Sequence, residues 1–140
     1  MKKTKKKSNC PINSALEVFG DKWTFLIVRD IMFNGKHYYG EFLNAEEKIS
    51  TNILADRLSL LEQSGIITKT KDNNHKSKFV YRLTQKGIDL LPILLEFIVW
   101  SSKYDKDVDE DNTFFESIRK DKIKMLDEIS NKLKNELIEH

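Results

Sequence analysis

The chain has 140 residues, of which 39% are hydrophobic and 33% are charged, and its formal net charge is +2. This is the length of one domain, so a large multidomain enzyme is excluded. No apolar run approaches the roughly 20 residues of a membrane helix, and no apolar segment follows the lysine-rich start as it would in a signal peptide. We therefore expect a cytoplasmic protein that does not enter the membrane.

Charge and metal-ligating residues narrow the function further. Residues 1–103 carry 17 basic and 11 acidic side chains, whereas residues 104–140 carry 7 and 11. A basic body suits a polyanionic partner such as nucleic acid. The single cysteine, Cys10, excludes an intrachain disulfide and a cysteine-rich zinc site, and the three histidines show no metal-binding spacing. We expect no metal and no other cofactor.

The start of the chain predicts a basic arm followed by two helices. Residues 1–9 contain five lysines and are expected to be disordered. Apolar residues recur at helical spacing from Pro11 to Phe19, and again from Asp21, a good N-cap, to Phe33. A glycine after each run marks the end of the helix.

The next segment predicts three elements in close succession. A small strand at 36–38 and a short helix at 39–45 precede a tight turn and a longer helix at 50–64. Ser50 is the N-cap candidate of the longer helix, and Gly65 is its stop. The apolar residues of that helix share one face and should pack inward: Ile53, Leu54, Leu58 and Leu61.

The remaining elements are a hairpin and two helices. Residues 66–71 and 78–83 predict two strands joined by a polar loop. A long apolar helix is expected from Thr84 to about Trp100, with Pro92 inside it as the place for a bend. The predicted C-terminal segments are an acidic linker at 102–111 and an amphipathic helix at 112–140.

This order of elements is typical of a winged helix-turn-helix, a mainly α fold with a small β-hairpin, here spanning residues 10–101. One helix of such a fold enters the major groove of DNA, and the helix before it braces the first against the backbone. The entering helix would be 50–64. Its first turn presents Thr51 and Asn52, and an asparagine can pair with adenine through two hydrogen bonds.

The hairpin is expected to contact phosphate. Six cations and one acid, Asp72, lie between positions 69 and 86. Such an excess of positive charge suits contact with the DNA backbone. We expect Lys76 and Lys78, with His75, to hold the hairpin on flanking phosphate or in the minor groove. The alternative is a hairpin that is merely solvated in a charge-rich protein.

The sequence also resembles the HxlR-type family of bacterial winged-helix regulators over roughly residues 9–101. The resemblance rests on several short motifs in the right order: Cys10-Pro11-Ile12, Gly20-Asp21-Lys22-Trp23, Gly40-Glu41-Phe42, Ile49-Ser50, Arg57-Leu58, Leu61-Glu62, Gly65-Ile66 and Tyr81-Arg82-Leu83-Thr84-Gln85-Lys86-Gly87. It implies a homodimer on near-palindromic operator DNA, with dimer contacts from the helices at 11–19 and 84–101. Two departures are notable, because members often carry a basic residue where Asn52 stands, and residues 102–140 lie outside the usual core.

Two single residues have competing interpretations. Cys10 lies at a helix N-terminus after three lysines, and both features favour the thiolate. Some members of the family use a cysteine at this position as a redox or electrophile switch, whereas the structural alternative is a small residue that packs the first helix. Arg57 could contact phosphate, helping Ser50 to place the helix on the backbone, or it could bond back within the fold.

The sequence thus predicts a sequence-specific DNA-binding regulator, which acts as a homodimer if it follows the family it resembles, and Cys10 is its candidate redox or electrophile switch. An enzyme is disfavoured, because no phosphate-binding loop and no nucleophile motif are present. The main alternative is a winged-helix module for protein–protein contact. The partner is double-stranded DNA and not a membrane, and the sequence does not identify an effector.

Overall fold

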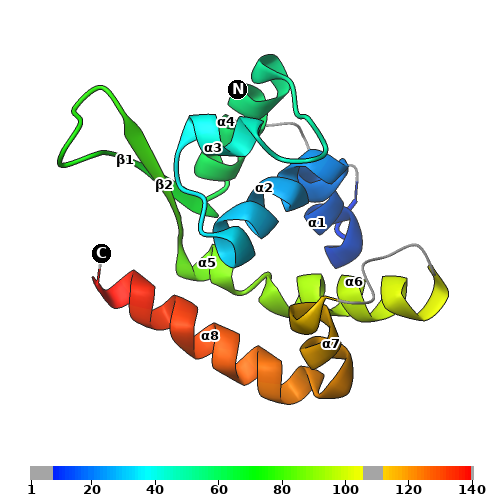
Figure 1. Cartoon of the computed structure of the whole chain (residues 1–140). Helices are drawn as coiled ribbons and strands as arrows, with labels where there is room; N and C mark the ends of the chain where they lie inside the picture. The colour runs from blue at the N-terminus through cyan, green and yellow to red at the C-terminus, as the bar shows by residue number, and fades with distance from the viewer. Residues whose placement is uncertain (1–7, 106–111, 140) are drawn as a thin grey trace. The chain divides into compact units, whose positions relative to one another are not determined.

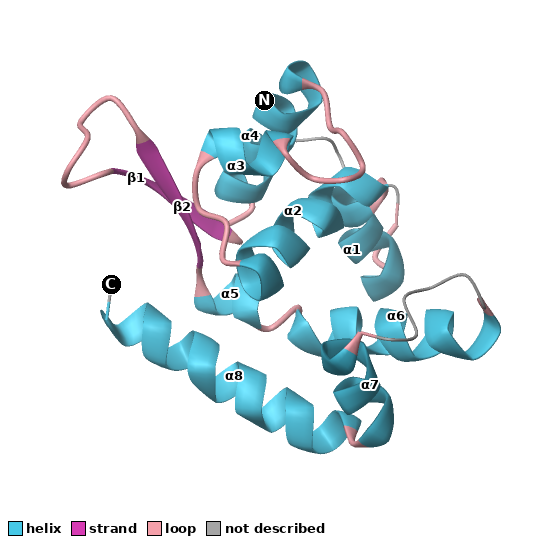
Figure 2. Ribbon diagram, viewed as in Figure 1, coloured by secondary structure: helices cyan, strands magenta, loops and turns pink. Residues whose placement is uncertain are grey.

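The structure, a computed structural model, describes residues 8–105 and 112–139. Most of the predicted basic arm and most of the predicted acidic linker lie outside the described residues. The described part contains helices α1 to α8 and one antiparallel hairpin, in two units that meet between Thr84 and Gln85 (Figure 1, Figure 2). The predicted winged helix-turn-helix is confirmed.

The first unit begins with α1 (Pro11–Phe19) and α2 (Lys22–Asn34), whose predicted bounds are confirmed to within a residue. α2 begins where it does because the Asp21 carboxylate accepts the backbone amides of its first turn, at 3.0 and 3.3 Å. It ends at Gly35, whose φ of 61° is a left-handed conformation that glycine adopts without strain. The inward face of α2 contributes core residues: Ile27, Val28 and Ile31.

No residue of α1 is buried. Ile12 is 71% exposed and Leu16 is 54% exposed, although both belong to the apolar face that the sequence predicted. The far end of the helix is held to α2, because the Phe19 ring stacks on Phe25 with centroids 4.3 Å apart. α1 therefore presents an apolar face to solvent in the single chain.

The helix-turn-helix consists of α3 (Tyr39–Leu43) and α4 (Thr51–Gln63). The predicted caps of α4 are confirmed: the Ser50 hydroxyl accepts the Ile53 amide at 3.3 Å, and Gly65 follows the helix with a φ of 75°. The inward face of α4 is closed, with three leucines buried to 3% exposure or less: Leu54, Leu58 and Leu61. Polar residues of the opposite face are therefore left for solvent or a partner.

A network of charges holds the turn between α3 and α4. The Arg29 guanidinium donates to both carboxylate oxygens of Glu47, at 2.7 and 2.9 Å, and also to the buried Asp30. The hydrogen bonds from Arg29 lower the pKa of Glu47 to about 2. Next to this pair, Lys48 has a φ of 56°, which costs a residue with a side chain roughly 1–2 kcal/mol. The ion pair thus fixes a turn whose backbone is locally strained.

The hairpin, called the wing below, consists of β1 (Ile67–Lys71), β2 (Phe79–Leu83) and the loop 72–78. Both strands lie within one residue of their predicted bounds, and Ile67 pairs with Leu83. The base of the wing joins the core through Tyr81, which is buried edge-on against the ring of Phe42, with centroids 6.1 Å apart. The loop lies at the end away from the helices of the first unit (Figure 1).

The predicted strand at 36–38 is wrong. The His37 amide, which would extend a ladder, instead donates to the Glu41 carboxylate at 3.0 Å, as does the Tyr38 amide. His37 still pairs with Tyr81: its carbonyl accepts the Tyr81 amide at 2.8 Å, and its imidazole Nδ1 donates to the Tyr81 carbonyl at 2.9 Å. A side chain therefore replaces the backbone donor that a third strand would need.

The second unit begins with two helices where the sequence predicted one. α5 (Gln85–Ile88) and α6 (Leu91–Tyr104) are separate, and Pro92 lies in the first turn of α6. The reason is that proline has no amide to donate within a helix but is tolerated where helical amides have no partner. α6 also extends past Trp100 into the segment predicted as linker, so residues 102–104 are helical.

The two sides of α6 differ in exposure. Leu91, Leu94 and Leu95 are buried within the second unit. The other side carries large apolar side chains that are 42–66% exposed and that recur every three or four residues, which places them on one face. This face is called the α6 stripe below and consists of Ile93, Phe97, Trp100 and Tyr104.

The predicted C-terminal helix is also two helices, α7 (Thr113–Lys120) and α8 (Lys122–Glu139). The break falls at Asp121, whose backbone leaves the helical region and whose carboxylate accepts the Lys124 amide at 3.1 Å. Both helices pack against α6 of the same chain, and they bury Ile118 and Leu133. None of the described helices is long and apolar enough to span a membrane.

Candidate nucleic-acid interface

The start of α4 has the exposure that a helix in the major groove requires. Thr51 and Asn52 are both exposed, as are Ala55 and Asp56 on the same side of the helix. Ser50 is exposed as well, although its hydroxyl is occupied by the cap. The polar first turn therefore projects from a helix whose other side is locked into the core, so a partner would meet it in a fixed orientation.

Arg57 bonds back within the fold. Its guanidinium donates to Asp21, the cap of α2, and to its neighbour Asp56, both at 2.5 Å. Burial alone would lower the pKa of this guanidinium, but the two carboxylates outweigh burial and raise it. Of the two roles that the sequence left open, the structure favours the internal one. Asp21 thereby links the start of α2 to the middle of α4.

The wing loop presents its cations to solvent in an ordered turn. His75, Lys76 and Lys78 are all exposed. The loop is closed by the Lys78 amide, which donates to the His75 carbonyl at 2.8 Å, and by Asp72, whose carboxylate accepts the Asn74 amide at 2.9 Å. That amide and the Tyr38 hydroxyl lower the pKa of Asp72, so the only acid of this region stays ionised and internally bonded.

Two tyrosines that the sequence analysis did not single out connect these parts. The Tyr38 hydroxyl donates to Asp72 of the wing loop at 2.9 Å, and the Lys78 ammonium lies over the Tyr38 ring. The Tyr39 hydroxyl donates to the carbonyl of Thr51, the first residue of α4, at 3.0 Å. Adjacent tyrosines just before a short helix were the available signal, but their partners are 12 and 34 residues away.

The match to known proteins identifies the fold. The sequence model of the HxlR-like helix-turn-helix family matches residues 18–109. The chain belongs to this family. YdeP of Bacillus subtilis, an uncharacterized HTH-type transcriptional regulator, is 30% identical over 101 residues, which are 72% of this chain and 78% of YdeP. The HxlR-like chain is therefore a helix-turn-helix transcriptional regulator and not an enzyme.

Solved structures of transcriptional regulators are also similar to this chain. The reduced form of the transcriptional regulator YodB from B. subtilis is 29% identical, with a TM-score of 0.58 over 73% of this chain and all of YodB. YodB has also been solved bound to quinone. The redox regulator HypR in its oxidized form is 33% identical, with a TM-score of 0.59 over 71% of this chain and all of HypR.

Cys10 of this HxlR-like chain is the N-cap residue of α1, and it is exposed. The backbone amides of Asn13 and Ile12 lower the pKa of its thiol, which agrees with the predicted effect of a helix N-terminus. The structural alternative, a cysteine that packs α1, is not favoured by this exposure. Among the described residues no group of three or more His, Cys, Asp or Glu side chains is arranged to hold a metal ion.

Proposed function

We propose that this regulator binds operator DNA sequence-specifically as a homodimer, with α4 in the major groove and the wing on the flanking backbone. The observation that carries the proposal is that the polar first turn of α4 and the basic wing loop are both exposed. A helix fits the major groove, and its first turn reaches the base edges. The basic loop matches the phosphate backbone.

The proposed roles follow from which side chains are exposed and which are already hydrogen-bonded within the fold. Thr51 and Asn52 have exposed polar groups and would read bases. Ser50 would place the start of α4 near the backbone while it caps the helix. His75, Lys76 and Lys78 would hold flanking phosphate or enter the minor groove. Arg57 is assigned a positioning role, because Asp21 and Asp56 occupy its guanidinium.

The homodimer is proposed from the two apolar faces. The exposed side of α1 and the α6 stripe each present large apolar side chains to solvent in the single chain. Contiguous exposed apolar surface commonly marks a protein interface. Both helices are the ones from which the family resemblance draws dimer contacts. A two-fold symmetric dimer would place two copies of α4 on two half-sites, so a near-palindromic operator is expected.

A winged-helix module for protein contact remains the alternative function, and the dependence of DNA affinity on salt separates the two. Phosphate contacts release counterions, so log K should fall linearly with log salt. The purified protein should therefore be titrated onto its own upstream DNA and onto random DNA at several salt concentrations. Saturable, tighter binding to the upstream fragment supports the regulator. Absence of binding at low salt contradicts DNA binding and favours the protein-contact module.

The assigned roles within the interface predict two different losses. Lys76→Ala combined with Lys78→Ala should weaken binding to operator and random DNA alike, because phosphate contacts carry no base information. Asn52→Ala should instead change the preference among operator variants by about 1–3 kcal/mol at one base pair. Competition titrations with single-base operator variants measure both. A uniform loss in both proteins would contradict the assignment of Asn52 to base reading.

We also propose that Cys10 makes the regulator responsive to oxidants or electrophiles. Support comes from its exposure and its lowered pKa, since the thiolate is the reactive form. Support also comes from the similarity to YodB, solved bound to quinone, and to HypR, described as a redox regulator. In a dimer, two Cys10 thiols could lose two electrons and two protons to an oxidant such as diamide and form an intersubunit disulfide.

The Cys10 proposal predicts that diamide changes the operator affinity of the wild type and leaves Cys10→Ser unchanged. A change of roughly 5- to 150-fold is the usual range for coupling between two sites. Because Cys10 is the only cysteine of the sequence, the serine variant has no other thiol to react. Operator titrations with and without diamide give the answer, and equal responses of the two proteins would end the proposal.

A further inference from the structure

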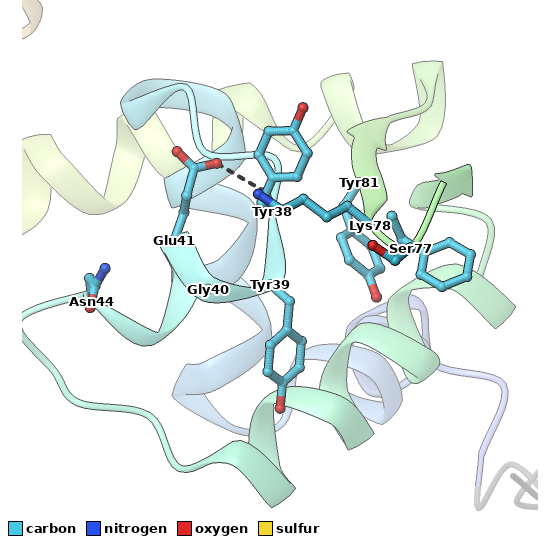
Figure 3. A pocket seen from close by; sticks show the side chains of 9 residues that line it. Tyr38, Tyr39, Gly40, Glu41, Asn44, Ser77, Lys78 and Tyr81 are labelled. Atoms are coloured by element: carbon cyan, nitrogen blue, oxygen red, sulfur yellow. Dashed lines mark hydrogen bonds between the residues drawn. The ribbon is translucent and has the colours of Figure 1, made fainter. Parts of the chain in front are cut away.

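An open groove lies between α3 and the wing, with a volume of about 570 Å³ (Figure 3). One wall comes from α3 and the residues on either side of it, and the other comes from the wing. The lining residues are Tyr38, Tyr39, Gly40, Glu41 and Asn44 on the first wall and Ser77, Lys78, Phe79 and Tyr81 on the second. The groove therefore joins two parts of the first unit that are far apart in the sequence.

The groove lies on the path between the two proposed DNA contacts. Tyr39 in its first wall donates to the carbonyl of Thr51, the residue that begins α4. Lys78 in its second wall belongs to the wing loop. A duplex that touches the first turn of α4 and the wing loop at the same time has to cross the groove.

The polar groups of the groove suit a phosphodiester. The Lys78 ammonium, the Ser77 hydroxyl and the Asn44 amide all belong to exposed residues, and such groups commonly bind phosphate. The tyrosine rings add apolar surface on which a deoxyribose can rest. The one carboxylate of the lining, Glu41, already accepts the backbone amides of His37 and Tyr38, each at 3.0 Å, which offsets part of its charge. The bond from Tyr38 is the dashed line in Figure 3.

The shape of the groove favours DNA over a small molecule. Sites for small ligands bury most of the ligand surface. Here six of the lining residues are exposed, and only Tyr81 is buried: Gly40, Glu41, Asn44, Ser77, Lys78 and Phe79 are the exposed ones. An extended DNA backbone can bind across such an open surface, whereas a small molecule bound there would remain largely exposed to water.

We propose that this groove seats the sugar–phosphate backbone of one operator strand, between the contacts made by α4 and by the wing. The inference rests on the proposed DNA-binding function and adds a third contact region to it. It assigns phosphate-binding roles to Lys78, Ser77 and Asn44. None of the three selects a base, so the groove contributes affinity and register.

Gly40 allows a direct test, because a side chain placed there enters the groove without disturbing the fold. A Cβ at Gly40 would meet no heavy atom within 4 Å, and its backbone is not left-handed. Gly40→Glu should weaken operator binding about fivefold, the effect of one unit charge at a few ångströms in water. Gly40→Lys should strengthen binding by a similar factor and raise the slope of log K against log salt by about 1.

The control is the same pair of charge changes at Asn131, an exposed residue of α8 in the second unit. Asn131→Glu and Asn131→Lys change the net charge by the same amounts without entering the groove, so they should change affinity less than twofold at physiological salt, where exposed charges are screened. Circular dichroism and thermal melts verify that all four variants are folded. If the Gly40 pair behaves like the Asn131 pair while the wild type binds DNA, the groove proposal is overturned. A wild type that does not bind DNA contradicts the proposed function itself.

Discussion

Replacing Phe97 and Trp100 together by aspartate is expected to convert the regulator to monomers and to weaken operator binding by roughly 10²- to 10⁴-fold. Both side chains belong to the α6 stripe, at 50% and 66% exposure, so the substitution leaves the core of the second unit intact. A dimer that buries this face would have to bury two carboxylates per protomer, which is costly. Each monomer would then bind one half-site without the gain that comes from linking two contacts.

The measurement is the molar mass in solution by light scattering, followed by operator titration. Ile123→Asp and Ile138→Asp on α8 are matched controls, because both isoleucines are more exposed than the stripe residues, at 77% and 83%. These variants should remain dimeric and bind operator as the wild type does. A double variant of Phe97 and Trp100 that stays dimeric, or monomeric α8 controls, would show that the interface lies on another surface.

Asp21→Ala is expected to lower the free energy of unfolding by about 1.5–2.5 kcal/mol, a large effect for a partly exposed side chain. The loss of an N-cap alone costs about 0.5–2 kcal/mol. The ion pair with Arg57 adds less than about 1 kcal/mol, because the two side chains are 36% and 26% exposed and water screens them. Asp21→Asn retains an acceptor for the amides of α2 and should lose only the ion pair with Arg57. Urea denaturation of both variants therefore separates the contribution of the cap from that of the ion pair.

Replacing the other partner of this ion pair, Arg57, tests whether its side chain positions α4 or contacts phosphate. If its guanidinium stays on Asp21 and Asp56, Arg57→Ala should lower stability and operator affinity and leave the salt dependence of binding unchanged. If it contacts phosphate, the slope of log K against log salt should fall by about 1. A reduced slope without loss of stability would therefore return Arg57 to the set of DNA contacts.

Element boundaries were predictable wherever one residue decides them. Asp21, Ser50 and Gly65 are local signals, and α2 and α4 begin and end beside them. The breaks between α5 and α6 and between α7 and α8 were missed, because apolar periodicity continues across both. The prediction of a strand at 36–38 was wrong because a strand needs backbone partners, and the Glu41 carboxylate accepts the amides that would supply them.

For the candidate site, the sequence predicted which side chains are exposed but not which residues distant in the sequence they contact. Exposure of Thr51, Asn52 and the wing cations followed from which face of α4 is apolar and from the polarity of the loop. The partner of Arg57 could not be predicted, because Asp21 is 36 residues away and either role of Arg57 fits the sequence. The groove was also missed, since it exists only when residues 38–44 and 77–81 are brought together by the fold.

The way the wing is attached has a consequence for how such a regulator can diverge. A two-stranded hairpin is marginally stable by itself. This one is anchored at its base by His37 and Tyr81 and at the start of its loop by the hydrogen bond from Tyr38 to Asp72, whereas residues 73–78 of the loop are exposed. Lengthening an exposed loop costs little, about 0.6 kcal/mol for each doubling. The reach of the wing can therefore change by insertion while α4 keeps its base preference, so the strength of DNA binding and the choice of operator can evolve separately.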